Sequence, residues 1–315
     1  MRKYFGTDGI RRIANSELTP ELVYKVAKAG AYVLSKHSNH TPTIFIGRDT
    51  RISGTLIEAA MTAGFLSYGA NVKRLGVIPT PGVAYLTKRF KADASVVISA
   101  SHNTFEFNGI KYFSNKGMKI PDTLEEEIEE VMDSGKIEEL TAMNDKIGVA
   151  EDRQDLLEEY VYFFRKNFEE DLENLDKENF VVAIDTANGA TSCVAEKVFT
   201  KLGIKHYIIN NHPDGININD KCGSTHMEGL QKFVVEHKCN LGIAYDGDGD
   251  RCLAVNEKGE LVDGDCIMAI ISNYLKEKGK LKKDTLVATV MSNLGLRKYA
   301  EDKGIHFEAT KVGDR

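Results

Sequence analysis

Hydrophobic and polar positions follow one pattern three times along the chain. Each block opens with a short apolar run, passes through a polar loop into a helical stretch, and reaches a second apolar run after glycine or asparagine. The blocks lie at residues 43–77, at residues 180–209 and from residue 285 to beyond residue 306. Runs of this length and order predict a strand, a helix and a second strand in each block. We therefore expect an α/β fold class built from repeated α/β domains.

Other segments predict the remaining helices and the domain boundaries. Apolar residues at helical spacing follow Thr19, which is a suitable N-cap, and the acidic stretch at residues 122–139 predicts a surface helix. Residues 141–152 are polar and without periodicity. A chain of 315 residues has room for two or three domains. We expect domains at 1–153 and 154–254, and an incomplete third domain at 255–315.

The apolar run at residues 96–98 ends abruptly in small and polar residues. A β-branched run bounded in this way predicts a buried strand, with Ser101 just beyond its carboxyl end. Open α/β sheets bind ligands at that end of their strands. Ser101 is therefore a candidate functional residue, and an ordinary serine in a strand-to-loop turn is the alternative.

A second apolar run, residues 241–245, leads into three aspartates separated only by glycines, Asp246, Asp248 and Asp250. Carboxylates this close repel one another unless a cation neutralises them, and glycine lets the backbone turn all three toward one point. Hard oxygen ligands favour Mg²⁺ or Ca²⁺ over zinc, and a site with few protein ligands suits Mg²⁺. This aspartate loop is therefore a candidate metal site.

Three other interpretations of the aspartate loop remain open on the sequence. An EF-hand would use Glu257 as its twelfth residue, but Arg251 stands where the motif needs glycine, and the flanks predict strands. The other two are a polar surface turn and a metal loop of phosphatase or glycosyltransferase type.

Composition and charge restrict the class of protein. The formal net charge of -6 argues against a general nucleic-acid surface. Five scattered cysteines without a Cys-x-x-Cys pair predict neither a disulfide framework nor a zinc knuckle. Apolar runs stay well short of the roughly 18 residues of a membrane span, and the first residues lack an apolar signal segment. We expect a cytoplasmic protein that binds neither membrane nor nucleic acid.

Near the start of the chain, residues 5–12 form a glycine-punctuated loop with two adjacent arginines, Arg11 and Arg12. The guanidinium fork suits bidentate phosphate binding, so Arg11 is a candidate anion contact. A solvated turn is the alternative.

Together these segments resemble the α-D-phosphohexomutase superfamily. The likeness is carried by Ser-Ala-Ser-His-Asn at 99–103, Asn-Gly-Ile-Lys at 108–111 and Asp-Gly-Asp-Gly-Asp-Arg at 246–251. Within the superfamily, the phosphoglucosamine mutase family is the one resembled by residues 5–11, 213–219, 222–226 and 290–295. The resemblance covers the whole chain. It implies three-layer α/β/α domains with mixed sheets, arranged around a central active-site cleft.

The resemblance implies a phosphate covalently bound to Ser101. It also implies Mg²⁺ held by Asp246, Asp248, Asp250 and an oxygen of the phosphoserine. The implied reaction interconverts glucosamine 6-phosphate and glucosamine 1-phosphate through a bisphosphorylated sugar, on the route to UDP-N-acetylglucosamine and the cell wall. A metal ion that takes up charge on phosphoryl oxygens would support transfer to and from a weakly nucleophilic serine.

The resemblance also gives roles to four other residues. Lys111 matches an acid/base lysine, Arg11 and Arg251 would contact phosphoryl oxygens, and His102 is expected mainly to orient Ser101. The side chain of lysine has a pKa of about 10.4 in water, so Lys111 would serve as a base only if burial or cationic neighbours lower its pKa. An ordinary strand-edge lysine is the alternative for Lys111.

The implied partner is a small phosphosugar. The resemblance is also compatible with a homodimer and with association with a diadenylate cyclase. A phosphomannomutase or phosphoglucomutase of the same superfamily is one alternative function, and a non-catalytic interaction module is another.

The sequence departs from the family pattern at three positions and at its end. Thr104 stands where proline is usual, Phe107 where aspartate is common and Arg12 where glycine is usual. Proline fixes φ and stiffens a loop, and Thr104 does not. The loop after Ser101 is therefore expected to be more mobile or differently shaped than in the family. After Val-Gly-Asp-Arg at residues 312–315, the family continues into a sugar-binding loop and a fourth, phosphate-binding domain. We expect a C-terminally truncated chain with little or no mutase activity alone, because remote binding contributes much of a catalyst's advantage.

Overall fold

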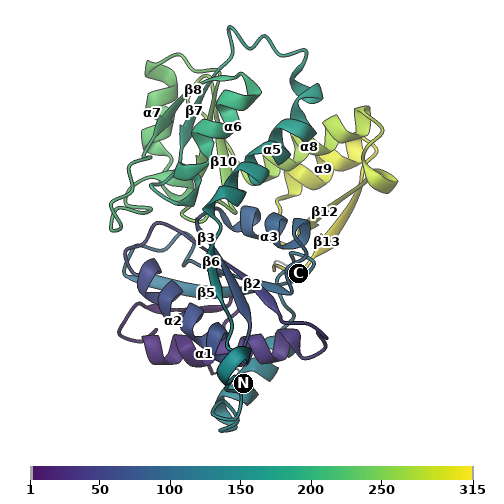
Figure 1. Cartoon of the computed structure of the whole chain (residues 1–315). Helices are drawn as coiled ribbons and strands as arrows, with labels where there is room; N and C mark the ends of the chain where they lie inside the picture. The colour runs from purple at the N-terminus through teal and green to yellow at the C-terminus, as the bar shows by residue number, and fades with distance from the viewer. Residues whose placement is uncertain (1–2, 314–315) are drawn as a thin grey trace.

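The computed structural model describes residues 3–313 as three α/β units in chain order (Figure 1). The first unit lies at the bottom of the view, the second lies above it, and the yellow third unit lies at the side. Asp314 and Arg315, which end the Val-Gly-Asp-Arg segment, lie outside the described residues, as do Met1 and Arg2.

The first unit is built on a six-stranded mixed sheet. Its strands, in spatial order, are β1 (Ile10–Ile13), β5 (Phe107–Ser114), β4 (Ala94–Ile98), β2 (Thr43–Arg48), β3 (Asn71–Val77) and β6 (Ala150–Asp152). The four strands β2, β3, β4 and β6 are parallel, whereas β5 runs antiparallel to both β4 and β1. The helices of this unit are α1 (Pro20–Ser35), α2 (Gly54–Tyr68), α3 (Thr80–Arg89) and α4 (Asp122–Asp133).

Helices cover both faces of this sheet, and the strand sequences reflect it. In β2, Ile44 and Ile46 point into the core shared with α1, α2 and α4, while Phe45 points into the core shared with α3. In β4, Val96 points into the first of these cores and Val97 points into the second. Strands buried on both faces are continuously apolar, which is why these runs are visible in the sequence.

The second and third units are smaller. The second has the sheet order β11 (Leu261–Val262), β10 (Cys252–Asn256), β9 (Leu241–Tyr245), β7 (Val181–Asp185) and β8 (Lys205–Ile209), with helices α5 (Leu157–Phe168), α6 (Ala195–Leu202) and α7 (Glu228–Glu236). The third pairs β12 (Thr285–Thr289) with β13 (His306–Thr310) beside α8 (Gly264–Glu277) and α9 (Leu294–Asp302). Short 3-10 turns lie at η1 (Asn144–Lys146), η2 (Gln154–Leu156), η3 (Glu170–Leu172), η4 (Ala190–Cys193), η5 (Gly223–Thr225) and η6 (Lys282–Asp284).

The three strand-helix-strand blocks predicted from the sequence are confirmed. They are β2-α2-β3, β7-α6-β8 and β12-α9-β13, and each strand pair is parallel. Helix α1 begins as predicted, with the Thr19 side chain accepting a hydrogen bond from Leu22 N at 3.3 Å. The acidic helix α4 ends at Asp133, before the acidic stretch itself ends.

The first two units meet through loops that follow their strands. Thr80 N donates to Asp248 O at 2.9 Å, and Ile52 N donates to Gly215 O at 2.9 Å. The Thr50 hydroxyl donates to Asn188 O at 2.6 Å. The loops after β2 and β3 therefore contact loops of the second unit, and residues distant in sequence become neighbours.

Within residues 3–313, none of the helices is both long enough and apolar enough to cross a membrane.

Candidate active site

Ser101 and the aspartate loop meet between the first two units. Ser101 lies just after β4, as predicted, and is fully buried. Its hydroxyl donates a hydrogen bond to Asp246 Oδ2 at 2.6 Å across 145 positions of sequence. The candidate nucleophile is therefore in direct contact with the candidate metal loop.

The three aspartates converge after β9. One carboxylate oxygen from each of Asp246, Asp248 and Asp250 lies within 4.8 Å of the others. The loop joins β9 to β10 in an antiparallel pair, so the EF-hand interpretation, which requires flanking helices, is wrong. Arg251 N donates to Asp246 Oδ1 at 3.2 Å and closes the turn.

These residues fit a divalent cation. Asp248 is completely enclosed, and its Oδ1 atom has no hydrogen-bond partner among the described residues. An acceptor left without a partner in a buried site is costly, and an ion would satisfy it. The other oxygen, Oδ2, accepts from the Thr80 hydroxyl at 2.8 Å, which fixes the orientation of the carboxylate. All-oxygen ligation is typical of Mg²⁺ and Ca²⁺.

The pKa values of the aspartate loop reflect the burial and close spacing of its carboxylates. Burial and the charge of Asp248 raise the pKa of Asp246 to about 6. Burial and the neighbouring carboxylates raise the pKa of Asp250 to about 7. Burial alone would also raise the pKa of Asp248, but Lys111 and Thr80 outweigh it and lower that pKa.

Lys111 points into the aspartate loop from β5. Its ammonium nitrogen lies 3.2 Å from Asp248, 3.5 Å from Asp250 and 3.2 Å from Asp8, and the side chain is almost fully enclosed. Burial on its own lowers the pKa of Lys111, but the three carboxylates outweigh it, so the pKa is raised. The sequence predicts that Lys111 acts as a base only if its pKa is lowered. These surroundings do not meet that condition.

Arg11 approaches the site from β1. Its guanidinium donates to Asp8 at 2.6 Å and to the side chain of Asn103, in the loop after Ser101, at 3.0 Å. Asp8 also lies 3.4 Å from the ammonium of Lys119. Burial raises the pKa of Asp8, but the cations Lys111, Lys119 and Arg11 outweigh it and lower that pKa.

His102 and Arg251 stand at the edge of the site. His102 Nδ1 lies 3.4 Å from the Ser101 hydroxyl. Burial and then the charges of Arg251 and Arg11 lower the pKa of His102, which favours the neutral ring. The side chain of Arg251 is 53% exposed and lies 3.9 Å from Asp250, so it is free to reach a ligand.

A cleft of about 720 Å³ opens beside these groups. This volume lies within the usual range for small-molecule sites. Its lining is rich in charge and includes Asp8, Arg11, Lys111, Lys119, Asp250 and Arg251. The third unit contributes Val312 and Gly313 to the same lining. Cations around a carboxylate cluster suit a ligand that carries phosphate.

Several residues of the site were not predicted from the sequence. Asp8 and Lys119 line the cleft, and Thr80 holds Asp248. Asp8 had a recognisable signal, because it is a carboxylate within the glycine-punctuated loop that carries Arg11. Thr80 and Lys119 had none, since their roles depend on contacts between segments distant in sequence.

The loop after Ser101 is held by hydrogen bonds at Thr104 and Phe107, two of the positions that depart from the family pattern. The backbone carbonyls of both residues accept hydrogen bonds from Arg51 Nη1. These bonds fasten the loop to Arg51, while a shape different from that of the family's loops stays a prediction.

Comparison with known proteins identifies relatives along the whole chain. Phosphoglucomutase/phosphomannomutase models match it as alpha/beta/alpha domain I at residues 2–139, domain II at 158–259 and domain III at 263–315. The chain is 54% identical over 317 residues to phosphoglucosamine mutase of Acetivibrio thermocellus, covering 100% of this chain and 69% of the relative. It is 52% identical over 315 residues to phosphoglucosamine mutase of Ruminiclostridium cellulolyticum, with the same coverage of both chains.

A solved structure shows the same fold. The crystal structure of a Phosphoglucomutase/phosphomannomutase family protein from Burkholderia thailandensis aligns with a TM-score of 0.80 at 20% identity. The alignment covers 99% of this chain and 67% of that one. The arrangement of α/β units is therefore shared with this family protein despite the low sequence identity.

Proposed function

We propose, since the chain belongs to the phosphoglucosamine mutase family, that its cleft transfers a phosphoryl group between Ser101 and the hydroxyls of a glucosamine phosphate. The observation that carries this proposal is the 2.6 Å hydrogen bond from the Ser101 hydroxyl to Asp246. It places the acceptor of the phosphoryl group against three convergent carboxylates, and the cations Arg11, Lys111 and Arg251 line the adjoining cleft.

The proposed reaction has two halves. In the first, the bond from phosphorus to Ser101 Oγ breaks and a bond from phosphorus to the free sugar hydroxyl forms, giving a bisphosphorylated sugar. The sugar hydroxyl loses a proton and the serine oxygen gains one. In the second half the other phosphate of the sugar returns to Ser101 Oγ, and the proton transfers reverse. Positioning and charge stabilisation supply most of the catalysis in such transfers.

We assign the metal site to Asp246, Asp248 and Asp250, with Mg²⁺ as the cation. When bound, Mg²⁺ would neutralise charge on the phosphoryl oxygens. The complete burial of Asp248 supports this assignment, as does its Oδ1 atom, which has no hydrogen-bond partner within residues 3–313.

We assign the proton transfer on the sugar side to Lys111. Its raised pKa suits the half in which it donates a proton to the sugar oxygen. For Lys111 to accept a proton, its ammonium group must first be deprotonated. This requires part of the negative charge of Asp8, Asp248 and Asp250 to be offset. Asp8, held by Arg11 and Lys119, is a second carboxylate that fixes the ammonium group of Lys111.

The remaining cations have phosphate-binding roles in this proposal. Arg11 already contacts the loop of Ser101 through Asn103, so it is placed to hold a phosphoryl group there. Arg251 is exposed at the mouth of the cleft and suits a phosphate of the incoming sugar. His102, with its neutral ring beside the Ser101 hydroxyl, orients that hydroxyl.

A discharge experiment tests this function. The chain is first phosphorylated with glucose 1,6-bisphosphate and Mg²⁺, and phosphopeptide analysis locates the phosphate. The labelled protein is then mixed separately with glucosamine 6-phosphate, glucose 6-phosphate and mannose 6-phosphate, and loss of the label is followed by intact mass. We expect the label on Ser101, no label in Ser101→Ala, and the fastest discharge to glucosamine 6-phosphate. Faster discharge to glucose or mannose phosphate would assign a different sugar. A label that none of the sugars removes, even at the slow rate expected of the 315-residue chain, would contradict the transfer.

A further inference from the structure

Ser101 has a backbone conformation that serine rarely adopts. Its φ angle is +51°, in the left-handed region, where a side chain crowds the following carbonyl. Such a conformation persists only where the surroundings impose it, and it is common at functional sites. The contacts of the Ser101 backbone therefore show what maintains this shape.

The first of these contacts come from a buried arginine. The side chain of Arg51 is fully enclosed, and its Nη2 atom donates to Ser101 O at 3.0 Å and to Asn103 O at 2.8 Å. Its Nη1 atom donates to the carbonyls of Thr104 and Phe107. Four backbone carbonyls of one loop thus converge on a single guanidinium group.

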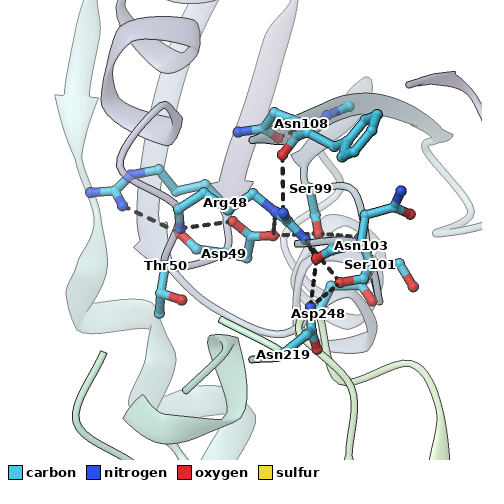
Figure 2. A network of polar contacts seen from close by, with 12 residues as sticks. Arg48, Asp49, Thr50, Ser99, Ser101, Asn103, Asn108, Asn219 and Asp248 are labelled. Carbon is cyan, nitrogen blue, oxygen red and sulfur yellow. Dashed lines mark hydrogen bonds and ion pairs between the residues drawn. The ribbon is translucent and has the colours of Figure 1, made fainter. Parts of the chain in front are cut away.

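A carboxylate and a serine complete this arrangement. Arg51 Nε donates to Asp49 Oδ2 at 2.8 Å, and the same oxygen accepts from the Ser99 hydroxyl at 2.6 Å. The Ser99 hydroxyl in turn accepts from Ser101 N at 2.9 Å. All five N–H groups of Arg51 are used within the protein, so this arginine has none left for phosphate. Figure 2 shows Asp49 and Ser99 beside Ser101.

The second unit supplies the other contacts, through Asn219. Its Nδ2 atom donates to Ser101 O and to Asn103 O, both at 2.9 Å, so each of these carbonyls is bonded from both units. Figure 2 shows Asn219 below the Ser101 loop. Gly247 of the aspartate loop packs directly against this contact, because a Cβ atom there would lie 2.6 Å from Ser101 O and 2.7 Å from Asn219 Nδ2.

We propose that Arg51 and Asn219 are positioning residues that act as a two-sided carbonyl clamp on the loop of Ser101. The clamp holds Ser101 in the left-handed conformation that directs its hydroxyl at Asp246. Since one side of the clamp belongs to each unit, the nucleophile takes its reactive shape only where the two units are apposed. This inference rests on the proposed function, because it assigns a role in phosphoryl transfer to and from Ser101.

Substitutions at Asn219 test the clamp with little other change. The Oδ1 atom of Asn219 has no hydrogen-bond partner among the described residues, so Asn219→Asp removes the donor group and alters no other recorded side-chain bond. The backbone at Asn219 has φ +57°, which Asp tolerates and Gly adopts freely. Asn219→Gly is therefore a second variant, without a buried charge. Asn217→Asp is the matched control, because it lies in the same loop and its side chain bonds only to residues 212–214 in the described structure.

The measurement is the rate at which Ser101 takes phosphate from glucose 1,6-bisphosphate with Mg²⁺, followed by intact mass over a range of donor concentrations. We expect both Asn219 variants to lower the rate at saturating donor by at least about tenfold, because small displacements of a reacting group cost this much or more. The half-saturating donor concentration should stay within about twofold of wild type, and Asn217→Asp should match wild type on both counts. A crystal structure of Asn219→Gly should show Ser101 with a changed φ.

The alternative outcomes separate the two proposals. If wild type and both folded Asn219 variants are labelled at the same rate, the clamp is overturned and the proposed function stands. A change confined to the half-saturating concentration would also overturn it, since that indicates donor binding. If Asn219→Asp does not fold, Asn219→Gly decides alone. A wild-type chain that takes no phosphate on Ser101 would overturn the proposed function, and the positioning role with it.

Discussion

At the scale of residues, the site depends on one hydroxyl and three convergent carboxylates, with the Ser101 hydroxyl donating to Asp246 Oδ2 at 2.6 Å across 145 positions of sequence. Ser101 and the three aspartates could be predicted because each follows a continuous apolar strand, and strand ends are where α/β sheets bind ligands. Arg51 was not singled out from the sequence, and every one of its donors is used inside the protein. Asn219 could not be predicted, because its partners are more than 100 positions away.

The assignment of the metal site predicts a severe effect of Asp248→Asn. One anionic ligand is lost while the repulsion between Asp246 and Asp250 persists, so Mg²⁺ affinity should fall by more than about tenfold, the loss that even an indirect partner of a metal can cause. Titration calorimetry of the wild type and the variant measures this directly. Glu257→Gln is the control, because this exposed residue belongs to the excluded EF-hand pattern and should leave affinity unchanged.

The raised pKa of Asp250 predicts how stability without metal depends on pH. Its usual value is near 3.8 and burial with neighbouring carboxylates raises it to about 7. Between these values the folded chain binds more protons than the unfolded chain at this residue, so its contribution to stability falls as pH rises. In EDTA, the Tm of wild type should therefore fall relative to that of Asp250→Asn from about pH 4 to about pH 7 and then level off. A Tm difference that is constant over this range would contradict the assignment, and saturating Mg²⁺ should remove most of the decline.

At the scale of elements, apolar periodicity predicted the three strand-helix-strand blocks because helices cover both faces of the first sheet. The antiparallel strands β1, β5 and β10 were not predicted as such, because their direction is set by pairing with distant strands. The acidic helix α4 was expected to present a solvated face, and it does more than that. Glu129 is buried, and its carboxylate accepts from the backbone N–H groups of Lys3, Tyr4 and Phe5, each at 2.7 Å.

This contact predicts that Glu129→Ala destabilises the first unit. The substitution leaves three backbone donors without their charged acceptor, and the segment they belong to leads into Asp8 and Arg11 of the cleft. We expect a loss of about 2–3 kcal/mol in the free energy of unfolding, measured by urea denaturation. Glu130→Ala changes an exposed neighbour on the same helix and should cost less than about 0.5 kcal/mol. Equal effects of the two substitutions would show that the contact contributes nothing.

At the scale of the whole molecule, apposition of the first two units creates the site, and the sequence carries no local signal for that apposition. The hydrogen bonds from Thr80 to Asp248, from Ser101 to Asp246 and from Asn219 to the Ser101 loop all cross between the units. The family resemblance predicted a cleft between domains. The contacts that build it follow from tertiary packing between segments far apart in the sequence.

The relatives are longer than the region they share with this chain, which spans 69% of the Acetivibrio thermocellus and Ruminiclostridium cellulolyticum proteins. We expect the 315-residue chain to label Ser101 but to interconvert glucosamine 6-phosphate and glucosamine 1-phosphate at under about 1% of the rate of either relative. Contacts with remote parts of a substrate supply much of the rate, and these 315 residues correspond to 69% of either relative. A coupled assay on the chain and one relative measures the ratio, and comparable rates would show that these residues suffice.

The central claim is that Ser101 and the three aspartates share one divalent ion, and the magnetic coupling between the metal and phosphorus tests it most directly. The chain phosphorylated on Ser101 is loaded with Mn²⁺ in place of Mg²⁺ and examined by pulsed electron-nuclear double resonance. We predict a ³¹P coupling of the size seen for a phosphate oxygen bound to the metal, absent from unphosphorylated protein. Phosphorylated protein that binds Mn²⁺ without such a coupling would contradict the account, because the ion would then be held apart from the serine.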